Sequence, residues 1–262
     1  MDTSYWCRQT ADNPLFPQLA WSRPENRLTA GKLLIIGGSA HGFAAPAEAY
    51  AESIRAGIGT SRALLPDAIQ KIVGILIEQA EFAPSTPNGS FSQKALDASL
   101  SLSHWADATL LAGDFGRNAE TAILLEKFLA KNTGAVTITK DAIDYTTSLS
   151  ASVLNRPNTL LVLSLAQLQR LGIAAKMPQA IKYGMDLLQL VSWLHTFTLM
   201  HAPHIIVRHL DTLFVAVNGT VSTTKQTSKQ PLWRLKTATY ASVWWLQNPG
   251  KPFEALTTSI AS

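Results

Sequence analysis

The chain has 262 residues, of which 47% are hydrophobic and 15% are charged, and this composition excludes a disordered or low-complexity protein. The length fits one large α/β domain, which we expect over residues 31–262 behind an N-terminal arm of residues 1–30. The net charge of +4 is a mild excess and predicts no nucleic-acid partner. The single cysteine, Cys7, excludes an intrachain disulfide and a zinc site built on two cysteines.

The sequence also bears on the compartment. One cysteine in 262 residues is typical of a reducing environment. Residues 1–8 lack the apolar core of a signal peptide. Residues 187–200 form the longest apolar stretch, but it is too short and too polar to span a bilayer. We therefore expect a cytoplasmic protein without a membrane partner.

The predicted elements begin after residue 30. Three prolines punctuate residues 1–30, which are expected to be irregular and to lie over the domain or over a partner subunit. Short apolar runs predict strands at 32–36, 61–65, 108–111, 135–139, 159–163 and 205–208. Asn218-Gly219 favours a type I′ hairpin between 213–217 and 220–223. Helices are predicted at 46–56, 67–79, 93–103, 118–130 (capped by Asn118), 167–172, 178–200, 233–247 and 252–260. This alternation predicts a mostly parallel sheet covered on both faces.

Three loops follow predicted strands, where ligands bind in open parallel sheets. The first, 37–42, contains three glycines with Ser39 and His41, and a helix start follows it; it fits an anion or a ribose, or is only a tight turn. The second, 112–118, contains Asp114 and Gly116 and again precedes a helix. The third carries Asp141 and Asp144, which either hold a metal or act as a base, or simply begin a helix.

The C-terminal third is unusually basic. Between Asp211 and Glu254 there is no acidic residue, while five basic side chains occur there: Lys225, Lys229, Arg234, Lys236 and Lys251. This pattern indicates either an anion-binding patch or a solvated loop. The spacing of the six histidines matches no metal-binding pattern, and no Walker A lysine motif is present.

Taken together, the order of these segments resembles the ribokinase-like superfamily, and more narrowly its ADP- or ATP-dependent NAD(P)H-hydrate dehydratases, which are carbohydrate kinase-like. The resemblance extends over roughly 32–255. Segment 32–46, with Gly37-Gly38-Ser39, resembles the family's first strand and its Gly-Gly-Ser loop. Segment 106–117 resembles its Ala-Asp-Ala…Gly-Pro-Gly-Leu-Gly-Arg stretch, 139–144 resembles Asp-Ala-Asp-Ala-Leu-Asn, and 252–255 resembles the start of a late helix.

The chain departs from this pattern where the family's chemistry lies. The family's Gly-Ser-Gly-Asp motif binds phosphate and supplies the catalytic aspartate, but the corresponding residues here are Trp233-Arg234-Leu235-Lys236. Lys236 therefore occupies the aspartate position, and a lysine is protonated near neutral pH unless it is strongly desolvated. The family's Lys-Gly pair is Arg208-His209, and its Gly-Pro-Gly loop is Ala112-Gly113-Asp114. The Thr-Pro-His-Pro-Gly-Glu segment falls on 162–167 without its histidine or glutamate.

Three functions stay open at this point. In the first, the chain is a dehydratase-like protein that binds a nucleotide and has weak or no catalysis. In the second, it is a non-enzymatic binding or interaction protein. In the third, it is an active dehydratase or small-molecule kinase with rearranged residues. The resemblance implies ADP or ATP as cofactor, NAD(P)H hydrate as substrate if the chain is active, an undetermined need for Mg²⁺, and a homo-oligomer (dimer or tetramer). No residue is assigned a catalytic role. The expected ligand-binding residues are Gly37, Gly38, Ser39, His41, Asp114, Gly116, Asp141, Arg208 and Arg234.

Overall fold

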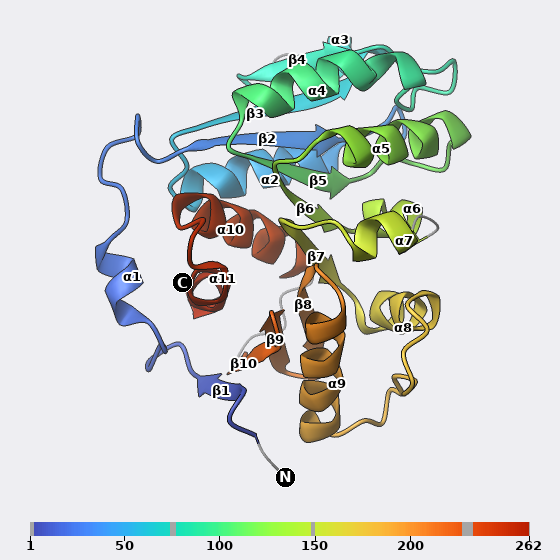
Figure 1. Cartoon of the computed structure of the whole chain (residues 1–262). Helices are drawn as coiled ribbons and strands as arrows, with labels where there is room; N and C mark the ends of the chain where they lie inside the picture. Colours follow the sequence, from blue (N-terminus) through green and yellow to red (C-terminus); the bar gives the residue numbers. More distant parts are fainter. Residues whose placement is uncertain (1–2, 74–76, 148–149, 227–232, 262) are drawn as a thin grey trace.

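A ten-stranded sheet runs through the whole molecule and separates two layers of helices (Figure 1). The computed structural model describes residues 3–73, 77–147, 150–226 and 233–261. The strand order is β1-β10-β9-β8-β7-β6-β5-β2-β3-β4, and all neighbours pair in parallel except the two pairs that include β9. The predicted mostly parallel α/β architecture is confirmed.

The strands of the sheet include all those predicted, most of them longer by one or two residues. They are β1 (Trp6–Gln9), β2 (Lys32–Gly37), β3 (Thr60–Pro66), β4 (Ala80–Ala83), β5 (Ala108–Gly113), β6 (Ala135–Thr139), β7 (Thr159–Leu163), β8 (His204–His209), β9 (Thr212–Val217) and β10 (Thr220–Lys225). Asn218 and Gly219 both have positive φ, at 46° and 81°, so the β9–β10 turn has the backbone that the Asn-Gly pair predicts.

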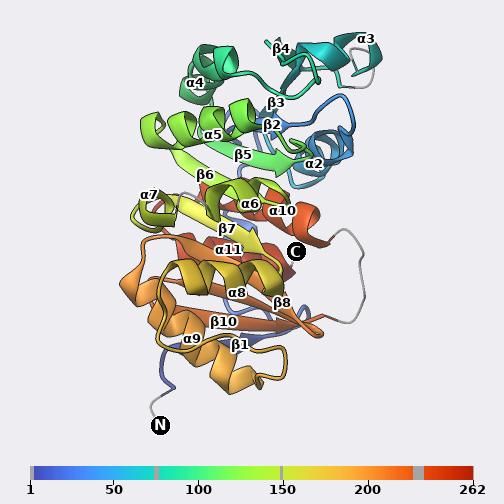
Figure 2. The same ribbon diagram turned by 90° about the vertical axis from the view of Figure 1, so that its right-hand side faces the viewer.

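The helices form a layer on each face of the sheet, and Figure 2 shows one of these layers in front. It contains α4 (Leu96–Trp105), α5 (Ala119–Lys131), α6 (Ala142–Thr147), α7 (Ser150–Leu154), α8 (Leu165–Ala174) and α9 (Leu187–Met200). The opposite layer contains α2 (Ala44–Arg55), α10 (Trp233–Gln247) and α11 (Pro252–Ala261), with the short α1 (Pro17–Trp21) against α11 and α3 (Gln70–Val73) near β3. Of the helices within the described ranges, none has the length and apolarity to cross a membrane.

The central strands are buried on both faces because helices cover both. In β2, Leu34 and Ile36 pack into one core while Leu33 and Ile35 pack into the other, as the period of two along a strand requires. Strands of this kind appear in the sequence as continuous apolar runs, which is why they were predictable.

The prediction that residues 1–30 are irregular is wrong at two places. β1 adds a parallel strand to the edge of the sheet beside β10, where the buried Gln9 donates from Nε2 to Thr224 Oγ1 at 2.9 Å. Further along, α1 buries Leu19 against Trp244. The N-terminal segment is therefore packed against the domain at β1 and at α1.

Two predicted helices are shorter than expected. The one predicted at 178–200 begins only at Leu187, because Asp186 caps it and forms a capping box with Gln189. The one predicted at 67–79 is a 3₁₀ turn (Asp67–Ile69) followed by α3; residues 77–79 are not helical, and 74–76 lie outside the described residues.

We expect acid to destabilise the fold through His204, which begins β8. Burial lowers the pKa of His204 to about 4 from its ordinary value of 6.5, and its buried Nδ1 has no hydrogen-bond partner among the described residues. Because the unfolded chain binds the proton more tightly, this group costs stability as pH falls from 6.5 to about 4, by an amount on the order of 3 kcal/mol at the end of that range. His204→Phe keeps a ring against Trp245 without titrating.

Urea unfolding at pH 7.5 and pH 4.5 checks this expectation. The loss of stability between the two pH values should be smaller in His204→Phe than in the parent chain. His41→Gln, a change at an exposed histidine, should leave the loss unaltered. Equal losses in all three proteins would contradict the account.

Candidate functional site

The carboxyl ends of β2, β5 and β6 bring the three predicted loops to one edge of the sheet. The backbone N–H of Gly38 donates to the carbonyl of Gly113 at 2.9 Å, which joins the first loop to the second. The backbone N–H of Asp114 donates to Asp141 Oδ1 at 2.7 Å, which joins the second loop to the third. Hydrogen bonds therefore link the three loops, through residues that include Gly37, Gly38, Asp114 and Asp141.

The side chain of Asp114 occupies the start of α2. Its Oδ2 accepts from the backbone N–H of Ala45 at 2.7 Å, and its Oδ1 accepts from Lys140 Nζ at 3.0 Å. An anion at this helix start would have to displace the carboxylate, because the first-turn amides and the nearby cation are what such an anion would bind. The start of α2, whose amides the sequence of the first loop predicts to be available to an anion, is thus already occupied by Asp114.

Asp141 organises the backbone of the second loop. Burial raises the pKa of the Asp141 carboxyl, while the backbone N–H groups of Asp114 and Phe115 act in the opposite direction. A carboxylate that accepts these amides holds the loop in place and is poorly placed to take a proton from a ligand. Asp141 therefore has a structural role here.

Gly113 makes this contact possible. Its φ is +107°, and a Cβ at this position would lie 2.7 Å from Asp141 Oδ1 and 2.7 Å from Lys140 Cβ. We expect Gly113→Ala to cost about 2–4 kcal/mol, from the strained backbone and the displaced carboxylate. Thermal unfolding measures this loss. Gly184→Ala is the matched control, since nothing lies within 4 Å of the added methyl group, and its effect should stay below about 1 kcal/mol.

The first turn of α10 carries no acidic side chain. Leu235 is buried in the core on the α10 face of the sheet, and Lys236 lies over the ring of Tyr240, with Nζ 5.4 Å from its centroid. Arg234 is half-buried and donates from Nη1 to Gln167 Oε1 at 3.1 Å. Of these residues, Arg234 is thus the cation directed toward the loops.

Gln167 connects Arg234 to the third loop. It is buried at the first turn of α8, where it forms a capping box with Ser164, and its Nε2 donates to the Lys140 carbonyl at 2.7 Å and to Asp144 Oδ1 at 3.3 Å. Asp144 also pairs with Arg170 at 2.7 Å. Burial lowers the pKa of Arg234, and the nearby carboxylates of Asp144 and Asp141 oppose that shift.

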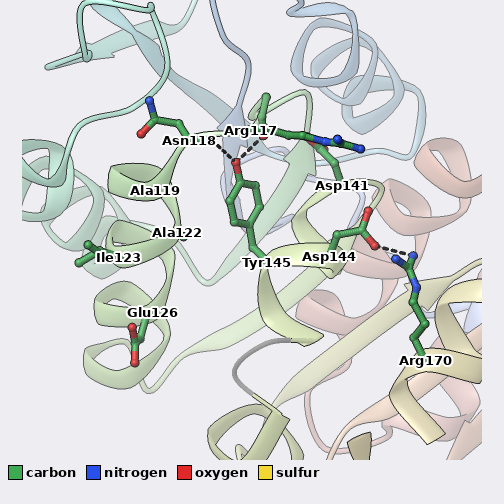
Figure 3. A pocket seen from close by; sticks show the side chains of 11 residues that line it. Arg117, Asn118, Ala119, Ala122, Ile123, Glu126, Asp141, Asp144, Tyr145 and Arg170 are labelled. Carbon is green, nitrogen blue, oxygen red and sulfur yellow. Dashed lines mark hydrogen bonds and ion pairs between the residues drawn. The ribbon is translucent and has the colours of Figure 1, made fainter. Parts of the chain in front are cut away.

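A cavity of about 450 Å³ opens beside this network, between α5, α6 and α8 (Figure 3). Tyr145 stands in its wall, accepting from the Asn118 backbone N–H at 3.0 Å and donating to the Gly116 carbonyl. The apolar side of α5 forms the opposite wall. The lining residues are Gly116, Arg117, Asn118, Ala119, Ala122, Ile123, Glu126, Asp141, Asp144, Tyr145 and Arg170.

The other predicted residues lie around this centre. Ser39 is buried and exchanges backbone hydrogen bonds with Gly42, while His41 is exposed. Gly116 faces the hydroxyls of Ser39 and Ser90, since a Cβ on it would lie 3.6 Å and 3.4 Å from them. Arg208, at the end of β8, donates from Nε to the Leu210 carbonyl at 3.2 Å, within the β8–β9 turn.

Sequence reasoning missed four side chains of the site: Lys140, Tyr145, Gln167 and Arg170. Gln167 had a usable signal, since Ser164 and Gln167 have the spacing of a capping box directly after a strand. Lys140 precedes the predicted Asp141 and Tyr145 follows the predicted Asp144, and neither belongs to a recognisable sequence pattern. Arg170 is one helical turn after Gln167, which places both on one side of α8.

The carboxylates of the site do not form a metal centre. Among the described residues, no three His, Cys, Asp or Glu side chains are placed to hold a metal ion. Asp141 is engaged by backbone amides, Asp114 by Lys140 and Ala45, and Asp144 by Arg170 and Gln167. These residues do not fit Mg²⁺.

Solved structures share this fold over nearly the whole chain. A ribokinase-like superfamily protein from Enterococcus faecalis aligns over 100% of this chain and 88% of its own, with a TM-score of 0.72 and 14% identity. An ADP/ATP-dependent NAD(P)H-hydrate dehydratase from Bacillus subtilis, co-crystallised with ATP and Mg²⁺, aligns over 94% and 86%, with a TM-score of 0.62 and 15% identity. A pyridoxal kinase from Staphylococcus aureus in complex with ADP aligns over 88% and 85%, with a TM-score of 0.54 and 14% identity.

These likenesses define the class of structure: the chain has the ribokinase-like α/β fold, which the sequence resemblance predicted. No protein-family model matches the sequence, and no curated protein matches it. Its neighbours in fold include small-molecule kinases and a dehydratase, and at 14–15% identity they establish the fold alone.

Proposed function

We propose that this protein binds a nucleotide-like anion at the carboxyl edge of its sheet and carries out little or no ATP-dependent dehydration. The observation that supports binding is the environment of Arg234. Its half-buried guanidinium is hydrogen-bonded to the neutral amide of Gln167, and within the described residues it forms no ion pair. A partly desolvated cation in this position gains most from an anionic ligand.

The same turn supports the loss of catalysis. The position at which related enzymes carry their aspartate is Lys236, whose ammonium group lies over Tyr240. The carboxylates nearby are already engaged: Asp141 by amides and Asp144 by Arg170. A general base has to be within hydrogen-bond reach of the proton that it accepts, and Oδ1 of each carboxylate would first have to give up its present donors.

Titration calorimetry with ADP tests the binding. We expect a saturable heat with the parent chain and a roughly tenfold or greater loss of affinity in Arg234→Gln, because a hydrogen bond to a charged group contributes about 1.5–3 kcal/mol. Arg8→Gln, on β1 at the far edge of the sheet, is the control and should bind as the parent does. The proposal fails if ADP, ATP and inorganic phosphate all give no saturable heat, or if Arg234→Gln leaves the affinity unchanged.

A further inference from the structure

The cavity between α5, α6 and α8 has an aromatic wall that the fold holds rigid. The hydroxyl of Tyr145 accepts from the Asn118 backbone N–H and donates to the Gly116 carbonyl, so its half-buried ring is fixed in one position. The buried Phe115 supports this ring in an edge contact, with 6.4 Å between the ring centroids. The volume of about 450 Å³ is within the range of small-molecule sites.

The opposite wall is a strip along α5. Ala119, Ala122, Ile123 and Glu126 have the spacing of one helix face, and all four line the cavity. Ala122 and Ile123 are only half-buried, so part of their apolar surface remains open to a ligand. The strip is therefore apolar over its first turns and ends in a carboxylate.

Most of the charges around the cavity are already engaged. Asp144 pairs with Arg170 at 2.7 Å, and Asp141 accepts the backbone N–H of the second loop. Among the described residues of the lining, the charged side chains that form no hydrogen bond or ion pair are those of Arg117 and Glu126. The cavity thus offers a ligand one positive and one negative charge.

These two charges lie at different ends of the cavity. Burial raises the pKa of Tyr145, and the charge of Arg117 is among the influences that lower it, so the guanidinium lies near the phenol. Glu126 is seven residues after Ala119, which is about 10 Å along the helix axis. In Figure 3, Arg117 lies above the ring of Tyr145 and Glu126 lies below it on α5.

We propose that this cavity binds a zwitterionic small molecule. Its anionic group pairs with Arg117, its cationic group pairs with Glu126, and its apolar middle lies between Tyr145 and the strip of α5. A charge separation of roughly 10 Å excludes a free α-amino acid, whose two charged groups share one carbon, and fits an extended chain of about three residues or an ω-amino acid of similar length. Arg234 does not line this cavity, so the site is additional to the one proposed for ADP.

Titration calorimetry with 8-aminooctanoate and with trialanine tests the proposal, because both can place their charges about 10 Å apart. At least one of them should give a saturable heat. Binding of trialanine alone identifies a peptide ligand, and binding of 8-aminooctanoate shows that no amide backbone is required. Octanoate and octylamine, which carry one charge each, and 4-aminobutanoate, which is too short, should bind at least tenfold more weakly.

Variants of the lining place the binding in this cavity. Arg117→Gln and Glu126→Gln should each weaken the zwitterion roughly tenfold, since each removes a hydrogen bond to a charged group, while Lys131→Gln, at an exposed residue of α5 outside the cavity, should not. Ala122→Leu fills the space between the walls and should abolish binding. Ala130→Leu, which adds the same bulk at an exposed position of α5, is its matched control.

Three results would overturn the proposal. The first is the absence of a saturable heat with both zwitterions. The second is binding of octanoate or octylamine as tight as that of the zwitterions. The third is an unchanged affinity in both Arg117→Gln and Glu126→Gln; because both residues are exposed, these variants should keep the far-ultraviolet circular dichroism and the Tm of the parent chain.

Discussion

Arg156→Ala should lower the stability of the protein by about 3–5 kcal/mol, which corresponds to a fall in Tm of about 10 °C for a chain of this size. Arg156 is 9% exposed, and no carboxylate of the described part of the chain pairs with its guanidinium, which donates to carbonyls from three parts of the fold. Burial lowers its pKa to about 10, which leaves it charged at neutral pH.

The size of this effect follows from where the carbonyls lie. Nε donates to Leu129 at 3.2 Å and Nη2 to Asn132 at 2.6 Å, both at the end of α5, and Nη2 reaches Gly134 at 2.8 Å just before β6. Nη1 donates to Thr159 Oγ1 at 2.8 Å at the start of β7. Carbonyls in the last turn of a helix have no partner within the helix, so truncating Arg156 leaves several buried acceptors without a donor.

Differential scanning calorimetry measures this change. Arg156→Lys should lie between the parent and the alanine variant, because one ammonium group cannot serve the same spread of carbonyls. Arg170→Ala removes an exposed arginine with a single surface ion pair and should cost about 1 kcal/mol or less. A change in Tm of under 2 °C in Arg156→Ala would show that the carbonyls find other donors.

Much of the fold was predictable because its central strands are buried on both faces. The runs at β2, β5 and β7 are largely apolar, β8 has an apolar centre between polar ends, and each precedes a turn or a helix start. The Asn218-Gly219 pair predicted the turn between β9 and β10 equally well, because these residue types favour the positive φ angles of a type I′ turn. β1 and β4 were missed because edge strands are short and partly polar: β1 reads Trp-Cys-Arg-Gln, and β4 reads Ala-Glu-Phe-Ala.

The candidate site was predictable only in outline. Parallel strands bring their carboxyl ends to one edge, so the loops at 37–42, 112–118 and 139–144 had to lie near one another. The contacts within that edge could not be derived from sequence. Asp114 meets Ala45 across 69 residues, and Arg234 meets Gln167 across 67. Neither contact follows from local pattern, and both change what the loops can bind.

ATP-dependent dehydration should be absent or about a thousandfold slower than in an intact dehydratase of this fold. A missing positioned base commonly costs 10²–10⁴ in rate. Lys236→Asp should not restore the reaction, because under the proposed correspondence Trp233 and the buried Leu235 stand where the glycines would expose backbone amides to phosphate. On this proposal, restoring an aspartate at position 236 would leave the missing amide loop unrepaired.

The most direct test of this account is the turnover of NADH hydrate by the unmodified protein with ATP, followed by the return of NADH absorbance and compared with an ATP-free control. The account predicts a rate indistinguishable from that control, in the parent chain and in Lys236→Asp alike, under conditions in which calorimetry detects ADP. Robust ATP-dependent turnover by the unmodified protein would contradict it.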